Sequence, residues 1–227
     1  VSDNQCIYKS TNGGINWTAI FCSSINDIFM CSPLVMFRSF SENYPPYSSS
    51  VAKSSDGGYN WVTLISGSTA SLGNIFFYDE NTGWVSNSSN LLYITTNGSS
   101  FNTTTLPTNI GSNKPIYFTN QNTGYFIGSN RYLYKSTNKG FNWVQWGLPD
   151  MYMSNYKFTD SLTGYMCGYY ASSVPGLIKK TTNGGANWTE ILRDTASSIP
   201  KISFVNSYTG YAVAGSKKLY RTTNGGL

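Results

Sequence analysis

The chain has 227 residues, a formal net charge of +5, only 11% charged residues and as much as 16% aromatic residues. With its many Tyr, Asn, Ser, Thr and Gly residues, this composition argues against long helices and favours short strands joined by turns. Its basic residues are scattered, which argues against a nucleic-acid-binding protein, and no stretch approaches the ~20 apolar residues of a membrane-spanning helix.

One short phrase recurs six times and sets a fixed period. Its copies, called boxes below, are residues 10–17, 54–61, 95–103, 136–143, 181–188 and 222–226. Each box carries an amide or acidic residue at an equivalent position: Asn12, Asp56, Asn97, Asn138, Asn183 and Asn224. These residues are spaced by 44, 41, 41, 45 and 41 positions. Such a period indicates an array in which each repeat is one supersecondary unit, here within one domain spanning residues 1–227.

A second phrase keeps the same period and is called the turn phrase below. It begins with Asp79, Asn120, Asp160 or Asn206 and reaches a glycine four residues later: Gly83, Gly124, Gly164 or Gly210. An aromatic residue follows each glycine. We expect a tight hairpin whose Asp or Asn side chain caps the turn and whose glycine adopts a positive φ.

Each repeat is predicted to hold four short strands. In the clearest repeat they are residues 115–119, 124–128, 132–136 and 142–146. First strands elsewhere are expected near 27–31, 74–78, 156–159 and 201–205, and second strands near 84–86, 165–169 and 211–215. Third strands are expected at 7–10, 52–54, 92–95, 178–181 and 219–222, and a fourth strand after each box. Four strands of about five residues in about 41 positions match one blade of a β-propeller.

The predicted fold is therefore all-β, a β-propeller of four-stranded antiparallel blades with about five repeats. The chain opens just before a third strand and stops in the turn after another. We accordingly expect a segment of a larger ring of about six to eight blades. Its open strand edges would be covered by neighbouring blades or by a partner chain.

The residues of a box have a mechanical explanation. The Asn or Asp side chain accepts hydrogen bonds from N–H groups of its own turn, the Ser or Thr two residues earlier ties the turn from the other side, and the glycine two residues later takes a left-handed conformation. The tryptophan that ends a full box is expected to pack between blades. We therefore interpret the six Asn and Asp residues as structural turn residues. The box at 95–103 lacks the tryptophan, which predicts a hairpin with weaker packing.

These residues resemble the Asp-box (bacterial neuraminidase) repeat, Ser/Thr-x-Asp-x-Gly-x-x-Trp. With the Gly-Tyr/Trp second strand, they look most like the repeat group typified by the photosystem II stability and assembly factor, which is found in secreted bacterial proteins. The resemblance covers nearly the whole chain: four boxes match fully, one is degenerate and the last stops before its tryptophan. It implies a propeller and specifies little about activity, because sialidases, xyloglucanases, sorting receptors and binding scaffolds share the motif.

The residues argue against an enzyme. The resemblance implies that a sialidase of this type needs three arginines for the substrate carboxylate, a Tyr–Glu nucleophile pair and an Asp as acid/base. The chain has only four arginines in all, Arg38, Arg131, Arg193 and Arg221, and no glutamate beside a tyrosine in a recognisable arrangement. A glycosidase needs two carboxylates flanking one bond. Only Asp27 and Asp150 stand outside the repeat turns as candidates, on different repeats. With no histidine, Ser–His and Cys–His devices are excluded. We expect no catalytic residue, no metal site and no cofactor.

Two insertions interrupt the period, at residues 37–50 and 169–175, and both are expected to project from the same rim between second and third strands. Insertions in repeat arrays often mark a working face. The candidate binding residues are Arg38, Tyr44, Tyr47, Tyr169 and Tyr170, since exposed Tyr is a favoured contact residue for sugars and proteins. Loops without a ligand are the alternative.

Four cysteines and five glycosylation sequons complete the inventory. Cys6 and Cys22 flank the first box at matching heights of a hairpin, which is compatible with a disulfide, while free thiols are the alternative. Cys31 and Cys167 have no evident partner. The Asn-x-Ser/Thr sequons stand at Asn16, Asn87, Asn97, Asn102 and Asn187.

The leading hypothesis is a non-catalytic propeller, secreted or on the cell surface (a periplasmic location is also compatible), that binds a protein or glycan or serves a structural role. It involves no nucleic acid and no membrane span. The first alternative is a sialidase-like glycoside hydrolase whose catalytic residues lie largely outside this segment. The second is an assembly factor that binds a subunit of a membrane complex.

Overall fold

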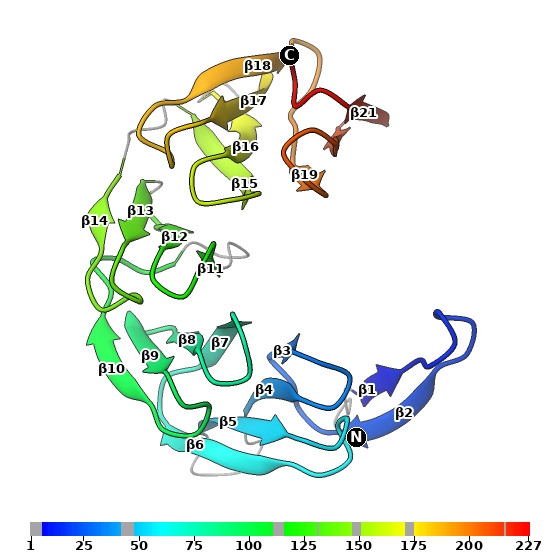
Figure 1. The fold of residues 1–227 in the computed structure, drawn as a ribbon, viewed down its shortest axis with the longest axis vertical. Helices are drawn as coiled ribbons and strands as arrows, with labels where there is room; N and C mark the ends of the chain where they lie inside the picture. Colours follow the sequence, from blue (N-terminus) through cyan, green and yellow to red (C-terminus); the bar gives the residue numbers. More distant parts are fainter. Residues whose placement is uncertain are drawn as a thin grey trace. The chain divides into compact units, whose positions relative to one another are not determined.

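The computed structural model describes residues 6–41, 48–110, 116–130, 132–146, 151–170, 175–215 and 217–227, and every regular element in these ranges is a β-strand (Figure 1). No helix in this part of the chain is long and apolar enough to cross a membrane. The chain forms two compact units, Val1–Asn109 and Ile110–Leu227. Each unit is described by itself.

The first unit contains a hairpin and two four-stranded antiparallel sheets, each in sequence order. The hairpin joins β1 (Cys6–Lys9) to β2 (Thr18–Cys22). The next sheet contains β3 (Asp27–Met30), β4 (Met36–Ser41), β5 (Ser49–Ser54) and β6 (Val62–Ser68). The third contains β7 (Leu72–Phe77), β8 (Gly83–Asn87), β9 (Leu91–Thr95) and β10 (Asn102–Thr105).

The second unit contains two four-stranded sheets and one three-stranded sheet, again antiparallel and in sequence order. The first is β11 (Tyr117–Phe118), β12 (Gly124–Ile127), β13 (Leu133–Ser136) and β14 (Val144–Gln145). The second is β15 (Tyr152–Phe158), β16 (Gly164–Tyr169), β17 (Gly176–Thr181) and β18 (Thr189–Asp194). The last is β19 (Lys201–Phe204), β20 (Gly210–Ala214) and β21 (Lys218–Thr222).

The predicted fold class is confirmed: each predicted strand range overlaps a strand, and the sheets are the blades of a β-propeller. One boundary was wrong. The first insertion was placed at 37–50, but β4 extends to Ser41 and β5 begins at Ser49. The reason is that residues 36–41 pair along their whole length with β5.

Neighbouring blades are held together by stacked aromatic rings. An aromatic side chain from the second strand of one blade lies flat on a phenylalanine from the first strand of the next. The pairs are Phe37 on Phe77, Tyr125 on Phe158 and Tyr165 on Phe204, with ring centroids 3.5, 3.9 and 3.6 Å apart and planes within 11° of parallel. All but Phe204 have less than 3% of their surface exposed, so each pair lies at the centre of one of these three interfaces between blades of the same unit.

The glycine of the turn phrase has a different role from the one predicted. Gly83, Gly124, Gly164 and Gly210 do not have a positive φ. Instead, a Cβ atom at Gly164 would lie 2.7 Å from two ring carbons of Phe158, and the other three would meet Phe77, Phe118 and Phe204 just as closely. The glycine is therefore required for space beneath the phenylalanine ring. In the sheet β3–β6 both positions are methionine, Met30 and Met36, which pair directly.

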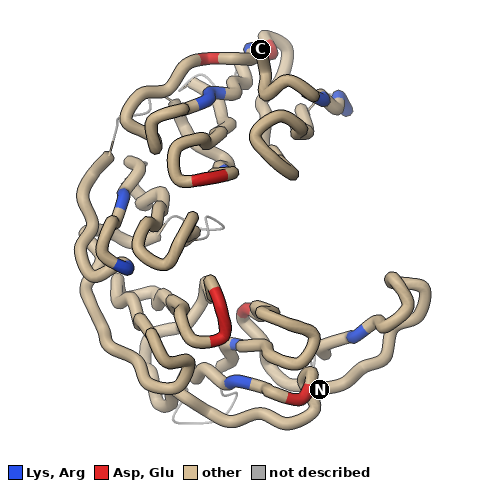
Figure 2. The backbone as a smooth tube through the Cα atoms, in the orientation of Figure 1, with Lys and Arg blue, Asp and Glu red and all other residues tan. Residues whose placement is uncertain are grey.

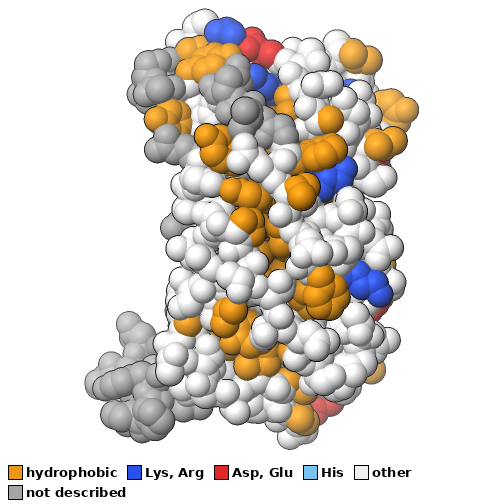
Figure 3. Space-filling view, turned by 90° about the vertical axis from the view of Figure 1, so that its left-hand side faces the viewer, with side chains coloured by type: hydrophobic (Ala, Val, Ile, Leu, Met, Phe, Trp, Pro, Cys, Tyr) orange, Lys and Arg blue, Asp and Glu red, His pale blue; other side chains and the backbone are white. Residues whose placement is uncertain are grey.

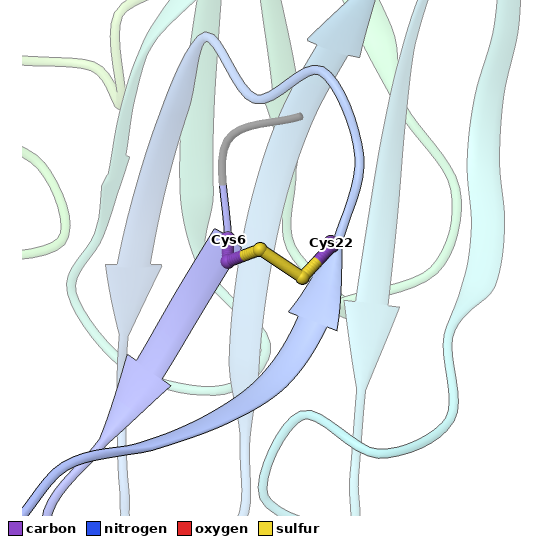
Figure 4. The surroundings of a disulfide bond; sticks show 2 residues. All are labelled: Cys6 and Cys22. Carbon is purple, nitrogen blue, oxygen red and sulfur yellow. A yellow bond between two sulfur atoms is a disulfide. The ribbon is translucent and has the colours of Figure 1, made fainter. Parts of the chain in front are cut away.

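The hairpin at the start of the first unit is closed by a disulfide. Cys6 and Cys22 are register partners in β1 and β2, and their sulfur atoms are bonded (Figure 4). Cys31 and the buried Cys167 are free thiols. The disulfide is one of the two alternatives that the sequence left open.

Candidate functional site

The box residues use their side-chain oxygens within their own turns. In the box of β17 and β18, the hydroxyl of Thr181 donates to Asn183 Oδ1 at 2.9 Å and accepts from the N–H of Gly185 at 2.9 Å, while Asn183 Oδ1 also accepts from the N–H of Asn187 at 2.9 Å. The same Ser/Thr-to-amide or carboxylate bond recurs at Asn12, Asp56, Asn97, Asn138 and Asn224. The glycine two residues after the amide or acid has a positive φ in the five boxes that carry one.

The box and the turn phrase of one blade are joined by the backbone. The N–H of Gly98 donates to Asn81 O, that of Gly184 to Leu162 O and that of Gly225 to Tyr208 O, each at 2.8 Å. Lys139 makes the equivalent bond to Asn122 at 3.0 Å. Because four boxes bond to the turn phrase of their own blade in this way, the two phrases keep the same period.

A basic residue just before the box, which the sequence had not singled out, donates to the next blade at three boxes. Lys9 donates to Gly57 O at 3.3 Å, Lys53 to Glu80 O at 3.3 Å and Lys180 to Gly225 O at 3.0 Å. The signal was available in the sequence, because the residue before a box is Lys9, Lys53, Lys135, Lys180 or Arg221 in every copy but the third. These lysines have a structural task. Figure 2 shows that the described Lys and Arg residues are distributed along the chain.

The sequence predicted that Arg38 projects from an insertion. The structure instead places it within β4, where only 6% of its surface is exposed. Its guanidinium carbon lies 3.9 Å from the ring centroid of Phe21, 4.5 Å from that of Phe40 and 4.6 Å from that of Trp61. Burial lowers the pKa of Arg38 to about 10. Three rings around a weakly hydrated guanidinium make this residue part of the packing between hairpin and blade.

Two other candidate binding residues, Tyr44 and Tyr47, lie outside the described residues.

Tyr169 is the last residue of β16 and Tyr170 follows it. Each forms a pair at this end of the strand, Tyr169 with Tyr152 and Tyr170 with Arg193, and we call the two pairs together the aromatic surface. Tyr152 and Tyr169 are register partners with stacked rings, 5.6 Å apart and 17° from parallel. The guanidinium of Arg193 lies 5.5 Å from the ring centroid of Tyr170. Glu190 accepts two hydrogen bonds from Arg193, at 2.8 and 2.7 Å, and so fixes its side chain.

The sequence identified two members of this surface and missed Tyr152 and Arg193. Tyr152 is brought to Tyr169 by strand pairing across a β-bulge between Met153 and Asn155, and Arg193 comes from the outermost strand. No local sequence motif indicates that either residue belongs to this surface. On the face drawn in Figure 3, polar side chains and backbone cover most of the described surface, hydrophobic side chains lie among them in patches, and charged side chains are few.

A pocket of ≈ 340 Å³ lies beside β21. Ile178, Ile191, Phe204, Ala212 and Tyr220 contribute apolar surface, and Gly226 and Asn224 of the last box form one wall. Tyr220 donates a hydrogen bond to Asp194, which also accepts from the N–H of Ala196 and lies 3.3 Å from Lys218. The backbone bond of Ala196 and the Tyr220 hydroxyl hold the pKa of Asp194 below its usual range.

The described carboxylates are engaged in structural bonds. Asp79 and Asp160 each accept two backbone N–H bonds in their turn phrases, and Asp56 does so in its box. Asp27 accepts from Ile28 and, across to the next blade, from Ile75 at 2.8 Å; burial raises its pKa. The equivalent residue in the second unit is Asn155, which accepts from Ile202 of the next blade. Because an amide oxygen makes the same bond, at 3.3 Å, the bond to the next blade does not require an ionisable group.

The second candidate acid, Asp150, lies outside the described residues. Among the described residues no group of His, Cys, Asp and Glu could hold a metal ion.

Comparison with known proteins supports the fold and goes no further. No protein-family profile and no curated protein matches this sequence. The GH74 enzyme of Niastella koreensis superposes with a TM-score of 0.66 at 16% identity, over 89% of this chain and 37% of that enzyme. The GH74 xyloglucanase of Xanthomonas campestris gives 0.66 at 13%, over 92% and 40%. YCF48 bound to D1 peptide gives 0.44 at 14%, over 90% and 79%.

This chain thus spans well under half of the GH74 enzymes that it resembles. At these identities the likeness concerns the β-propeller fold alone.

Proposed function

We propose that this chain is a non-catalytic β-propeller of the Asp-box repeat type that binds a protein through the aromatic surface. The observation that carries the proposal is the use of the described carboxylates. Turns engage Asp56, Asp79 and Asp160, and Asp27 repeats a bond that an asparagine makes in the second unit. Glycosidic hydrolysis needs two carboxylates facing one bond, and these side chains are committed elsewhere.

A protein fits the aromatic surface better than a glycan. Sugars stack on open ring faces, but Tyr152 and Tyr169 lie against each other and Arg193 covers Tyr170. What the surface offers is ring edges, tyrosine hydroxyls and a guanidinium fixed by Glu190. Tyr and Arg are the residues that most often dominate the binding energy of protein interfaces.

We further propose a secreted or cell-surface location. The Cys6–Cys22 disulfide supports it, because disulfides persist in oxidising compartments. Liquid chromatography–mass spectrometry of the protein purified from its native source, alkylated without reduction, tests this. Intact Cys6–Cys22 supports the location, and alkylated thiols at both residues contradict it.

Selection from a random peptide library displayed on phage, run in parallel with a glycan array, tests the binding function. We expect peptide ligands whose affinity falls at least ~10-fold in Tyr169→Ser and Arg193→Ala, the loss associated with one hot-spot residue. Tyr208→Ser is the matched control, because Tyr208 is 65% exposed and belongs to the turn phrase of the next blade. Ligands found only on the glycan array would contradict the choice of a protein partner. Release of reducing sugar from xyloglucan or sialyllactose would contradict the non-catalytic assignment.

A further inference from the structure

We propose a second binding site, independent of the aromatic surface: the pocket between the box at 54–61 and the box at 95–103 binds a neutral oligosaccharide. Both boxes belong to the first unit, in which the four-stranded blades β3–β6 and β7–β10 pack against each other. The site therefore lies inside one unit, between two neighbouring blades.

The pocket combines an apolar wall with polar side chains from both boxes. Its volume is ≈ 420 Å³, within the range of about 300–1,000 Å³ that is typical of small-molecule sites. Val62 and Leu64 of β6 form the apolar wall. The box side chains that line it are Asp56, Asn60, Asn97 and Ser99. An apolar surface with a few converging polar groups is the usual composition of a ligand site.

Leu64 explains why the space is open at this junction. Three residues after its box tryptophan, the blade β11–β14 carries Trp146, whose ring centroid lies 4.5 Å from Lys135 Nζ. The indole of Trp146 also donates to Gly184 O of the next box at 2.7 Å. Leu64 and Lys53 are the equivalent residues of the blade β3–β6, and both line the pocket. Because a leucine is smaller than a tryptophan and has no N–H, it leaves room and an unoccupied polar rim for a ligand.

The box at 95–103 also departs from the repeat beside this pocket. A Cβ atom at Gly58 would lie 2.6 Å from Cδ1 of Ile20 in the preceding hairpin, so that position normally allows no side chain. Ser99 is the equivalent residue, whereas the other five boxes have glycine there. The hydroxyl of Ser99 donates to Asn97 Oδ1 at 3.1 Å. This junction therefore has an extra polar side chain, fixed by its own box, where the others have none.

Asp56 is the only acidic residue among the six equivalent box positions, and it holds a neighbouring amide in place. Its Oδ2 accepts from Asn60 Nδ2 at 2.6 Å. The backbone N–H and the side-chain amide of Asn60 lower the pKa of Asp56 to about 2, so the carboxylate is ionised at neutral pH. Within the described ranges, Asn60 Oδ1 and the exposed hydroxyl of Ser55 form no hydrogen bond with the protein. An amide that is already fixed, with an open acceptor, loses little freedom when a ligand binds.

The charges in the pocket favour a neutral ligand. Asp56 and Lys53 both line it, so an anion would meet the carboxylate and a cation would meet the ammonium group. Nζ of Lys53 donates to Glu80 O at 3.3 Å, which uses one of the three hydrogens of an ammonium group.

A sugar ring matches these groups better than a peptide does. Each sugar hydroxyl both donates and accepts hydrogen bonds, and most ring carbons carry one, whereas a peptide backbone offers one donor and one acceptor per residue. Sugar hydroxyls can thus bond to Asn60 Oδ1, Ser55 and Lys53, while the C–H groups of the ring lie on Val62 and Leu64.

A printed array of neutral and charged glycans, probed with the labelled full chain, tests the ligand class. We expect binding to neutral oligosaccharides, and isothermal titration calorimetry with the strongest of them gives the affinity in solution. Binding to no glycan, or only to sialylated, sulfated or phosphorylated glycans, would overturn the proposal.

Leu64→Trp tests the position of the site, because it introduces the side chain that the fold already has at Trp146. It should fill the pocket and reduce the affinity for the selected oligosaccharide at least ~10-fold. Thr63→Trp places the same side chain at the neighbouring residue of β6, which is exposed and does not line the pocket, and it should leave the affinity unchanged. Circular dichroism melting establishes that both variants fold. A folded Leu64→Trp variant that binds like the parent chain would refute the site.

Asn60→Ala tests the polar side of the pocket without filling it. Loss of the fixed amide should reduce the affinity at least ~10-fold, the effect associated with one important contact residue. Asn142→Ala is the matched control, because Asn142 is exposed at the same position of the box at 136–143. Equal affinities of these two variants would contradict a role of Asn60 in binding.

The two binding sites can be told apart. Tyr169→Ser should bind the oligosaccharide normally, and a loss of binding in that variant would place the sugar on the aromatic surface and refute the second site. A library peptide whose affinity falls in Leu64→Trp but not in Arg193→Ala would make the pocket a peptide site and overturn the choice of a sugar. Failure of the glycan array leaves the library selection on the aromatic surface as an independent test.

Discussion

The two turns of the blade β15–β18 look alike in sequence and differ in what they require of their glycine. In the turn phrase, Asp160 Oδ1 accepts the N–H groups of Leu162 and Thr163, and in the box Asn183 Oδ1 accepts that of Asn187. Gly185 of the box has φ +85°, a backbone angle that other residues resist. Gly164 of the turn phrase has no such angle and is needed because Phe158 occupies the space of a side chain. Glycine is thus required for two different reasons: a positive φ in the box, and the absence of a side chain beside Phe158 in the turn phrase.

Among the substitutions that test this comparison, Gly164→Val is expected to lower the free energy of unfolding most. Its Cβ would start 2.7 Å from the Phe158 ring, which is fixed by its stack on Tyr125, so that backbone or ring must move. We expect a loss of about 3 kcal/mol in the free energy of unfolding. Urea denaturation measures it. Gly73→Val is the control, because a Cβ at Gly73 of β7 meets nothing within 4 Å; equal losses in the two variants would refute the space argument.

Trp188→Ala should have the next largest effect. Trp188 packs against the core cluster that two blades share and meets Phe158 of its own blade. We expect a loss of about 2 kcal/mol, less than for a fully buried tryptophan because the side chain is only partly buried. Trp17 occupies the same box position but is 62% exposed, so Trp17→Ala should cost less than about 1 kcal/mol. A similar loss in both variants, measured by thermal melting, would show that burial does not distinguish the boxes.

Thr181→Val tests the hydrogen bonds of the box without changing its shape. The substitution leaves the N–H of Gly185 without its acceptor in a buried position. The expected cost is about 1.5 kcal/mol. Thr182→Val changes the adjacent, exposed residue and should lie within about 0.5 kcal/mol of the parent in urea denaturation. If the two valine variants are equally stable, the hydroxyl of Thr181 does not support the turn.

Asp56→Asn should give the smallest effect, visible only in the pH dependence. The backbone N–H of Asn60, its side-chain amide and further donors lower the pKa of Asp56 from 3.8 to about 2. Because the folded pKa lies below the unfolded one, the carboxylate contributes stability above about pH 4, and this contribution is lost as the pH falls toward about 2. Asparagine fills this position in the other boxes and does not titrate.

Urea midpoints at about pH 6 and about pH 2.5 should therefore differ less in Asp56→Asn than in the parent chain. Asp160 and Asp194, whose pKa values are also lowered, keep some dependence in both proteins. An unchanged difference between the two midpoints would contradict the assignment of the low pKa to Asp56.

The fold could be predicted from the sequence because each blade repeats its turns. Thr181, Asn183 and Gly185 form their bonds within five residues, so the same short phrase produces the same turn wherever it occurs. The candidate site was predicted only in part. Tyr169 and Tyr170 stood in a visible insertion, whereas Tyr152 and Arg193 reach them from other strands of the sheet.

By itself, the sequence determined the period, the strand order and the positions of the turns, because hydrogen bonds between close neighbours need only local residue types. The tertiary structure alone decided which role each glycine has, that Arg38 is buried among Phe21, Phe40 and Trp61, and that lysines before the boxes reach the next blade. Most of these contacts join different strands: Lys180 and Gly225 are 45 positions apart, and Arg38 in β4 meets Phe21 of the hairpin. Their partners are determined only when the blades pack, because the aromatic rings and cations then have to fill the interface without voids or clashes.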